Sequence, residues 1–429
     1  MYIIIAIGIY HQDWPLVGYL PNLVISAYRT GLPPAQLLDS LAKKYGQVFS
    51  INIAGKLVVV LNNFQYVKEG YNNPSLEDRL VPRLKKDLGD GGRFASHSWK
   101  EQKRIILTTL RGLGVGKRSF EANISEEAAF LADEIRSCKV LEVTHFFNNA
   151  TANVICSVVL GKRFEYSDLS FKRLTDTFTQ NAKNFALAQF FPFVKYLQLS
   201  RYNAMAKNVK CTMDFAEDFV NGHKKVHVEN EPNDFIDVYL DEIKQRQKSN
   251  LDSFVNEKNL IAIVRDIFAA GTETTSSTLR WAVLYMIVFP QIQDRIRQEL
   301  DSVVGRNRLP KLTDEKELPF TCATLLEVQR IASITPFSGL HLCGQDTALG
   351  PYAIPKGTII VPNLWAIHHH PDLWPEPDEF NPERFLDEDG VLQEKEELIP
   401  FSIEHDFMVR EMTRNMPHLV DPDEKYLIP

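Results

Sequence analysis

The chain has 429 residues, of which 44% are hydrophobic and 24% are charged, so it is long enough and apolar enough to bury a large core. Its formal net charge of -7 argues against a general nucleic-acid binder, because such proteins cluster Lys and Arg against phosphates. The five cysteines lie far apart and form no C-x-x-C pair, which indicates neither a disulfide framework nor a zinc site and fits a reducing, cytosol-facing location.

The first segment, residues 1–13, begins with an apolar run of about ten residues, whereas a helix needs roughly 20 residues to span a bilayer. It also lacks the basic start and the small-residue cleavage site of a signal peptide. We therefore expect no full transmembrane anchor in this segment. It is either an apolar membrane contact or what remains of a longer anchor.

A small sheet is predicted near the start and a large helical body after it. Two β-branched runs, 48–53 and 56–61, flank Ala54-Gly55, which predicts a hairpin. Long amphipathic stretches with few glycines or prolines fill residues 99–309 and favour helices. After Pro336 the chain breaks into short strands and turns. The fold class is therefore mainly α, an α-rich α+β plan in one domain.

One long helix is predicted over residues 260–290, where roughly 30 residues would cross about 45 Å. Near its middle, Gly271 weakens the helix by up to roughly 1 kcal/mol. Thr274 can bond back to a carbonyl one turn earlier, and Glu273 stands beside it. Two interpretations stay open: a crossing of small residues, which the short motif alone favours, and a proton-delivery site.

A charged pair follows, because Glu327 and Arg330 stand three residues apart and share one face of a helix. Such a pair is most often solvated and contributes well under roughly 1 kcal/mol. The residues after it, 331–337, are mostly apolar and indicate a partly buried helix. We therefore expect Arg384, some fifty residues later, to complete a buried Glu-Arg-Arg cluster.

Three consecutive histidines, His368 to His370, would suggest a metal site by composition. Adjacent histidines on an irregular segment do not converge on one ion, so we interpret them as structural.

Three of these motifs occur in the order and spacing of a known family. Ala270-Gly-Thr-Glu-Thr, Glu327-x-x-Arg330 and Pro382-Glu-Arg-Phe385 resemble the oxygen-activation helix, the E-x-x-R helix and the meander of the cytochrome P-450 family. The resemblance covers residues 14–403 and implies the P-450 fold, with Glu327, Arg330 and Arg384 as a folding clasp and not as reacting groups. Segments similar to the animal microsomal family 2 group are Pro15-Leu-Val-Gly-Tyr-Leu-Pro, Trp99-Lys-Glu-Gln-Lys103-Arg, Asn233-Asp-Phe-Ile-Asp-Val-Tyr-Leu and Tyr352-Ala-Ile-Pro-Lys-Gly-Thr.

The resemblance implies a heme b cofactor, whose propionates would be held by Arg79, Trp99, Lys103 and His341. Lys103 stands where the family has an arginine, which keeps the charge but loses the bidentate fork.

The implied reaction inserts one oxygen atom from O2 into an apolar organic substrate, a lipid or a xenobiotic. Its electrons come from NADPH through NADPH-cytochrome P-450 reductase, and Glu273 and Thr274 act as catalytic residues that deliver protons. The implied location is the endoplasmic reticulum membrane, on its cytosolic face. Residues 164–199, which would cap the pocket, carry no readable code for the substrate.

The resemblance ends at Ile403. There the family continues as F-x-x-G-x-R-x-C-x-G, whose cysteine thiolate binds the iron and supplies electron density for O–O cleavage. Here Met408 occupies the cysteine position, and its thioether is neutral and gives no comparable electronic push. The other replaced positions of the pattern are Glu404, Asp406 and Arg410.

We interpret residues 404–429 as a non-family tail, which takes the place of the ligand loop and of the helix and strands that follow it. Its source would be a different exon, a retained intron or a faulty gene model. The alternative is a pseudoenzyme, a catalytically dead P-450-like binding protein. In both cases we expect this chain to be inactive as written.

Overall fold

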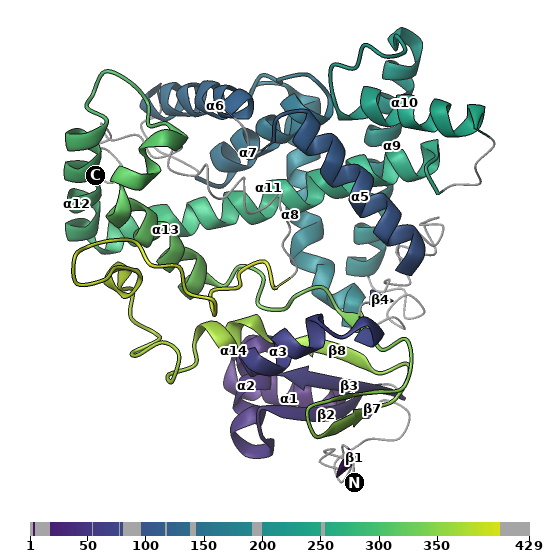
Figure 1. Ribbon diagram of the computed structural model, residues 1–429, viewed down its shortest axis with the longest axis vertical. Helices are drawn as coiled ribbons and strands as arrows, with labels where there is room; N and C mark the ends of the chain where they lie inside the picture. The colour runs from purple at the N-terminus through teal and green to yellow at the C-terminus, as the bar shows by residue number, and fades with distance from the viewer. Residues whose placement is uncertain are drawn as a thin grey trace. The chain divides into compact units, whose positions relative to one another are not determined.

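The computed structural model describes residues 3–4, 18–53, 55–76, 78–79, 96–115, 118–137, 143–190, 200–249 and 254–403. Residues 404–429, which include Met408, lie outside this set. The described chain forms two compact units (Figure 1). The first, the sheet unit, holds the residues up to Arg79, Ser96, and those from Leu326 onward. The second, the helical unit, holds the residues from His97 to Leu325.

The sheet unit contains a five-stranded sheet with the order β2-β3-β8-β5-β4. The predicted hairpin is confirmed, since Ile53 pairs with Lys56 across a two-residue turn. Gly55 in that turn has φ 77°, a conformation that favours glycine. Strand β3 also pairs in parallel with β8, so the sheet joins distant parts of the sequence. The strands are β2 (Val48–Ile53), β3 (Lys56–Leu61), β4 (Asp78–Arg79), β5 (His341–Leu342) and β8 (Ile359–Pro362).

A second, smaller sheet and several short helices complete this unit. The smaller sheet has the order β1-β7-β6, with β1 (Ile3–Ile4), β6 (Thr347–Leu349) and β7 (Tyr352–Ile354). The core of the unit is aliphatic and includes Val59, Leu61 and Ile360, each at most 3% exposed. The helices are α1 (Leu20–Thr30), α2 (Pro34–Tyr45), α3 (Phe64–Tyr71), α14 (Leu364–His368) and the 3-10 turns η2 (Pro74–Leu76) and η5 (Pro382–Phe385).

The helical unit confirms the prediction of a mainly helical middle. Its long helix α11 (Glu257–Val288) has 32 residues, and the side chain of Asn256 caps its first turn by accepting from Asn259 N. The other elements are α5 (Ser96–Gly112), α6 (Arg118–Ser137), α7 (Val143–Val159), α8 (Leu169–Phe190), α9 (Ser200–Val226), α10 (Phe235–Lys248), α12 (Pro290–Val303), η4 (Leu312–Glu317) and α13 (Pro319–Ala332), whose last residues belong to the sheet unit.

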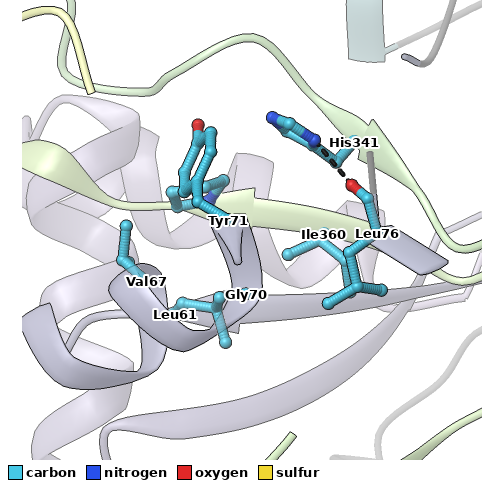
Figure 2. Close-up of a pocket in the computed structure, with 8 residues that line it drawn as sticks. Leu61, Val67, Gly70, Tyr71, Leu76, His341 and Ile360 are labelled. Atoms are coloured by element: carbon cyan, nitrogen blue, oxygen red, sulfur yellow. Dashed lines mark hydrogen bonds between the residues drawn. The ribbon is translucent and has the colours of Figure 1, made fainter. Parts of the chain in front are cut away.

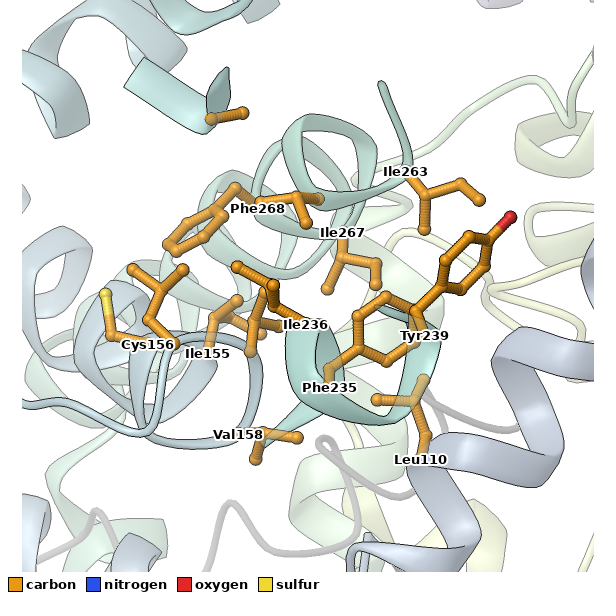
Figure 3. Close-up of a cluster of buried hydrophobic side chains, with 14 of the residues drawn as sticks. Leu110, Ile155, Cys156, Val158, Phe235, Ile236, Tyr239, Ile263, Ile267 and Phe268 are labelled. Carbon is orange, nitrogen blue, oxygen red and sulfur yellow. The ribbon is translucent and has the colours of Figure 1, made fainter. Parts of the chain in front are cut away.

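The core of the helical unit lies where α11 meets α7 and α10 (Figure 3). Ile263, Ile267 and Phe268 of α11 pack with Ile155 of α7 and Phe235 of α10, and each is at most 6% exposed. Helix α7 is buried around most of its circumference, and its buried side chains are amides as well as apolar groups. None of the helices that the structure describes is long and apolar enough to cross a bilayer. The fold class is confirmed as a mainly helical α+β chain with small sheets.

Candidate functional site

Glu273 lies near the middle of α11, where it forms the centre of a polar network. Its Oε2 accepts a hydrogen bond from Thr179 Oγ1 of α8 at 2.8 Å. Its Oε1 accepts from Ser277 Oγ at 3.2 Å and from Arg280 Nη2 at 2.9 Å. Both carboxylate oxygens are therefore engaged, and the acid ties α11 to α8.

Thr274 is directed differently, because adjacent residues of a helix point about 100° apart. Its hydroxyl donates to Ala270 O at 2.5 Å, one turn earlier, as the sequence indicates. The structure therefore places the predicted acid and alcohol side by side along the chain but engages them with different groups.

The network around Glu273 continues into α7 through a residue that the sequence interpretation missed. Asn148 donates its amide N–H to Thr179 Oγ1 at 2.7 Å and accepts from the Ser276 hydroxyl of α11. A signal was present, since a buried amide in an apolar helix needs a hydrogen-bonding partner. Three such amides, Asn148, Asn149 and Asn153, lie within the buried part of α7.

The clasp in the sheet unit consists of Glu327, Arg330 and Arg384. Arg330 binds the Glu327 carboxylate in a bidentate manner, with Nε–Oε2 and Nη2–Oε1 distances of 2.7 and 2.8 Å. Arg384 Nε reaches Oε1 at 3.0 Å. Glu327 and Arg330 are 0% exposed, so the pair is a buried one and not a surface pair.

Backbone carbonyls accept hydrogen bonds from further N–H groups of the two arginines. Arg330 donates to the carbonyls of His368 and Pro377 at 2.8 and 2.9 Å. Arg384 donates to the carbonyls of Pro375 and Glu379 at 2.9 and 3.1 Å. These contacts make the clasp a device that fixes the path of residues 375–379.

The three consecutive histidines face different partners. His368 is 1% exposed and places Nδ1 at 2.7 Å from Ser333 Oγ. His369 stacks on Trp365 with ring centroids 4.2 Å apart, and His370 is partly exposed. This divergence is what structural histidines would show, and it does not gather three ligands around one ion.

Arg79 and His341 are partners across the β4–β5 ladder. His341 is 4% exposed and donates from Nδ1 to Leu76 O at 2.7 Å (Figure 2). Its ring meets that of Tyr71 edge to face, with the ring centroids 4.8 Å apart. The two rings border an apolar cavity of about 10 Å³, close to the smallest space that holds one water. The side chain of Arg79 lies outside the described residues.

Lys103 and Trp99 both lie on α5 of the helical unit. Lys103 is partly exposed, and the side chain of Trp99 lies outside the described residues. The neighbouring Gln102 is 0% exposed, accepts from Tyr239 Oη at 2.6 Å and donates to Phe254 O at 2.6 Å. These bonds fix the turn of α5 that presents Lys103.

The three buried cysteines of the described residues, Cys156, Cys322 and Cys343, do not fit the thiolate ligand that the resemblance implies. Burial raises the pKa of the Cys156 and Cys343 thiols, which keeps both sulfurs protonated. Cys322 is also buried, and its Sγ donates to Glu315 O at 3.7 Å. The sequence contains no cysteine after Cys343. The chain as written therefore offers no thiolate in the ligand segment.

Comparisons with known proteins agree on one family. A family model described as Cytochrome P450 matches residues 10–403. Cytochrome P450 2U1 of Homo sapiens is 34% identical over 420 residues, which cover 91% of this chain and 77% of that protein. Cytochrome P450 2J3 of Rattus norvegicus is 38% identical over 401 residues, which cover 91% of this chain and 78% of that protein. Cytochrome P450 2J2 of Homo sapiens is 36% identical over 373 residues, with 84% and 74% covered.

Proposed function

The chain belongs to the cytochrome P450 family of heme monooxygenases, and from that membership we propose a function in two parts. The fold serves the insertion of one oxygen atom from O2 into an apolar substrate, a lipid or a xenobiotic, with electrons from NADPH through a reductase. This activity belongs to a form of the protein that supplies a cysteine ligand. The chain with its present residues 404–429 does not catalyse it.

The single observation that carries the second part is the set of cysteines. Oxygen activation in this family depends on a thiolate that donates electron density to the iron. The position expected for it holds Met408, and the described cysteines Cys156 and Cys343 are buried thiols in other parts of the fold. The match of the family model over residues 10–403 supports a domain boundary at Ile403.

For a form with the cysteine we retain the residue roles predicted from the resemblance. Glu273 and Thr274 handle protons, and their separate hydrogen-bonding partners support two distinct tasks rather than one shared relay. Propionate contacts are assigned to Arg79, Trp99, Lys103 and His341. The reductase as partner and the cytosolic face of the endoplasmic reticulum membrane as location rest on the similarity to family 2 relatives.

The test is a comparison of two chains that differ only after Ile403. One is the present chain, and the other replaces residues 404–429 with the F-x-x-G-x-R-x-C-x-G continuation, and the segments after it, from a family 2 relative. Heme content, the carbon monoxide difference spectrum of the reduced protein and NADPH-dependent product formation are measured for both. We expect a thiolate-type spectrum and turnover from the chimera alone.

Two results would contradict the proposal. Stoichiometric heme with a thiolate-type spectrum in the present chain would disprove its inactivity. A chimera that folds and binds heme but never forms product would disprove the monooxygenase function of the scaffold. If the present chain is folded, free of heme and still binds apolar ligands, it acts as the catalytically dead binding protein.

Thr274→Ala in the chimera tests the proton-handling role. We expect NADPH consumption to continue while product formation falls, because protons then reach the site without control. Thr278→Ala is the matched control, since its hydroxyl makes the same type of bond to the carbonyl one turn earlier, Thr274 O at 3.0 Å. Unchanged coupling in Thr274→Ala, or equal uncoupling in both variants, would contradict the role.

A further inference from the structure

Two histidines and three aspartates meet where α9 ends and α10 begins, within the helical unit. We call this cluster the corner; it consists of His223, His227, Asp234, Asp237 and Asp241. The histidines are four residues apart and therefore lie on one face of the chain at the end of α9. The aspartates follow helical spacing at the start of α10 in the same way. All five side chains are at most 16% exposed.

His223 has acceptors at both ring nitrogens. Its Nδ1 lies 2.8 Å from Phe219 O, and its Nε2 lies 2.7 Å from Asp234 Oδ2. A histidine whose Nδ1–H donates to a backbone carbonyl presents its Nε2 lone pair to a metal in the usual way. The atom at Nε2 must therefore be a proton or a metal ion that the carboxylate also binds.

His227 shows an electrostatic mismatch on the other side of the corner. Its Nε2 donates to Asp241 Oδ1 at 2.8 Å, so a neutral ring carries a lone pair at Nδ1. That Nδ1 is buried, makes no hydrogen bond and faces Asp237 Oδ1 at 3.4 Å. The side chain is only 3% exposed, so bulk water does not screen these two electron-rich atoms. A cation at this point would satisfy both.

The negative charge of the corner is in excess. Three carboxylates face two imidazoles, so a net negative charge remains even when both rings are protonated. Lys224, which follows His223 in the sequence, is paired elsewhere, since its Nζ lies 2.7 Å from Glu257 Oε2. Backbone N–H groups donate to Asp234 Oδ1, Asp237 Oδ2 and Asp241 Oδ2, and a bound cation would neutralise the charge that remains.

The dimensions of the corner suit a small transition-metal ion. One ligand atom each from His223, Asp234 and Asp237 lie within 4.8 Å of one another. Zinc binds nitrogen and oxygen at about 2.0–2.2 Å in a tetrahedron, whose edges are then about 3.3–3.6 Å. The 3.4 Å between His227 Nδ1 and Asp237 Oδ1 matches such an edge. The distance of 2.7 Å between His223 Nε2 and Asp234 Oδ2 has to lengthen by about 0.6 Å to match the same edge.

We propose that the corner binds one divalent transition-metal ion of the zinc class, through His223 Nε2, Asp234 Oδ2 and Asp237 Oδ1, with His227 Nδ1 as the fourth ligand. Imidazole and carboxylate together suit zinc better than magnesium or calcium, which prefer oxygen ligands alone. The site joins the last turn of α9 to the first turn of α10. Its role is structural and separate from oxygen chemistry.

The test uses the full chain after removal of metal with a chelator. Zinc binding is measured by competition with a chromophoric chelator, and Co2+ substitution is followed by its visible absorption. We compare the wild type with Asp237→Asn and His223→Gln. The matched control is His145→Gln, which alters a His–Asp pair of the same 3.4 Å separation on α7 and α8, away from the corner.

We expect one tight equivalent of zinc in the wild type and in His145→Gln. Asp237→Asn and His223→Gln should bind that equivalent at least about 100-fold more weakly, because each loses a direct ligand. Asp237→Asn keeps the shape of the side chain, so its circular dichroism should match the wild type. Equal binding by all four proteins, no tight binding by any, or preference of the wild type for Mg2+ or Ca2+ would overturn the proposal.

Discussion

The clasp and the corner are both clusters of buried charged side chains, but they differ in how donors and acceptors are matched. In the clasp, one carboxylate faces two guanidinium groups, and the spare N–H groups reach backbone carbonyls. In the corner, carboxylates outnumber imidazoles, and one ring nitrogen faces a carboxylate oxygen without a hydrogen bond. Burial of charge alone therefore does not indicate a ligand site. A buried cluster in which acceptors outnumber donors is the better indication of one.

The largest expected loss of stability comes from a substitution that breaks the clasp. Glu327→Gln removes the carboxylate that both Arg330 and Arg384 bind and should lower the free energy of unfolding by about 3–5 kcal/mol, because a buried charge is left uncompensated. Urea unfolding followed by circular dichroism measures this change. Glu376→Gln is the control, since its side chain is exposed and only its carbonyl meets the clasp. Equal stability of the two variants would contradict the role of the clasp.

The next effect concerns the pH dependence of stability. It tests whether His368, whose backbone carbonyl accepts from Arg330, stays neutral in the folded protein. Burial lowers the pKa of His368 to about 3, whereas the unfolded chain takes up this proton near 6.5. The stability that a neutral His368 contributes is therefore complete above pH 6.5 and is lost as the pH falls. Between pH 7 and pH 5 the loss is about 2 kcal/mol.

The measurement for His368 is a difference between proteins, because other groups also titrate. The stability of the wild type minus that of His368→Gln should shrink by about 2 kcal/mol between pH 7 and pH 5. His370→Gln, which removes a partly exposed histidine two residues away, is measured beside it as the control. A constant difference for His368→Gln would mean that the folded protein accepts this proton easily.

A smaller effect sharpens the comparison at the corner. Without metal, Asp237→Asn should leave the stability unchanged or raise it by up to about 1 kcal/mol, because an amide N–H then faces His227 Nδ1 while the amide oxygen still accepts from Asn233 N. Asp241→Asn should instead lower it by about 1 kcal/mol, since both its oxygens already accept hydrogen bonds. Thermal unfolding in a chelator distinguishes the two; a reversed order would count against the mismatch.

The smallest effect serves as a baseline for exposed charge. Lys224 binds Glu257 at 2.7 Å beside the corner, but both side chains are 43% exposed. Lys224→Ala should therefore change the free energy of unfolding by no more than about 0.5 kcal/mol. High salt should reduce even this difference, which is checked by repeating the unfolding curve. A change of several kcal/mol would show that the short distance matters more than exposure.

Local spacing made part of the molecule predictable. The hairpin follows from two β-branched runs around Gly55, and α11 follows from a long apolar stretch without proline. The meeting of Glu327 with Arg384 was predicted from motif order, although no local rule places residues fifty positions apart in contact. The polar partners of Glu273 were not predictable, because sequence periodicity shows which face of α8 is buried but not which helix covers it.

Neighbours in the sequence also proved a poor guide to shared chemistry. Glu273 and Thr274 are consecutive, yet the helix turns them toward different partners. His223 and Asp234 are separated by a whole loop, yet their side chains are in contact. The helical spacing of the corner histidines and aspartates was visible in the sequence. The sequence did not show that the end of α9 lies against the start of α10, and this contact is what forms the corner.

The arginines of the clasp bind the backbone of residues 375–379 through main-chain oxygens, which every amino acid has. The side chains of Pro375, Glu376 and Glu379 are exposed and are not what the clasp recognises. The side chains of residues 375–379 can therefore be substituted without loss of these contacts, provided that each new residue adopts the same backbone conformation. At Glu376, where φ is 50°, that condition favours drift toward glycine or asparagine.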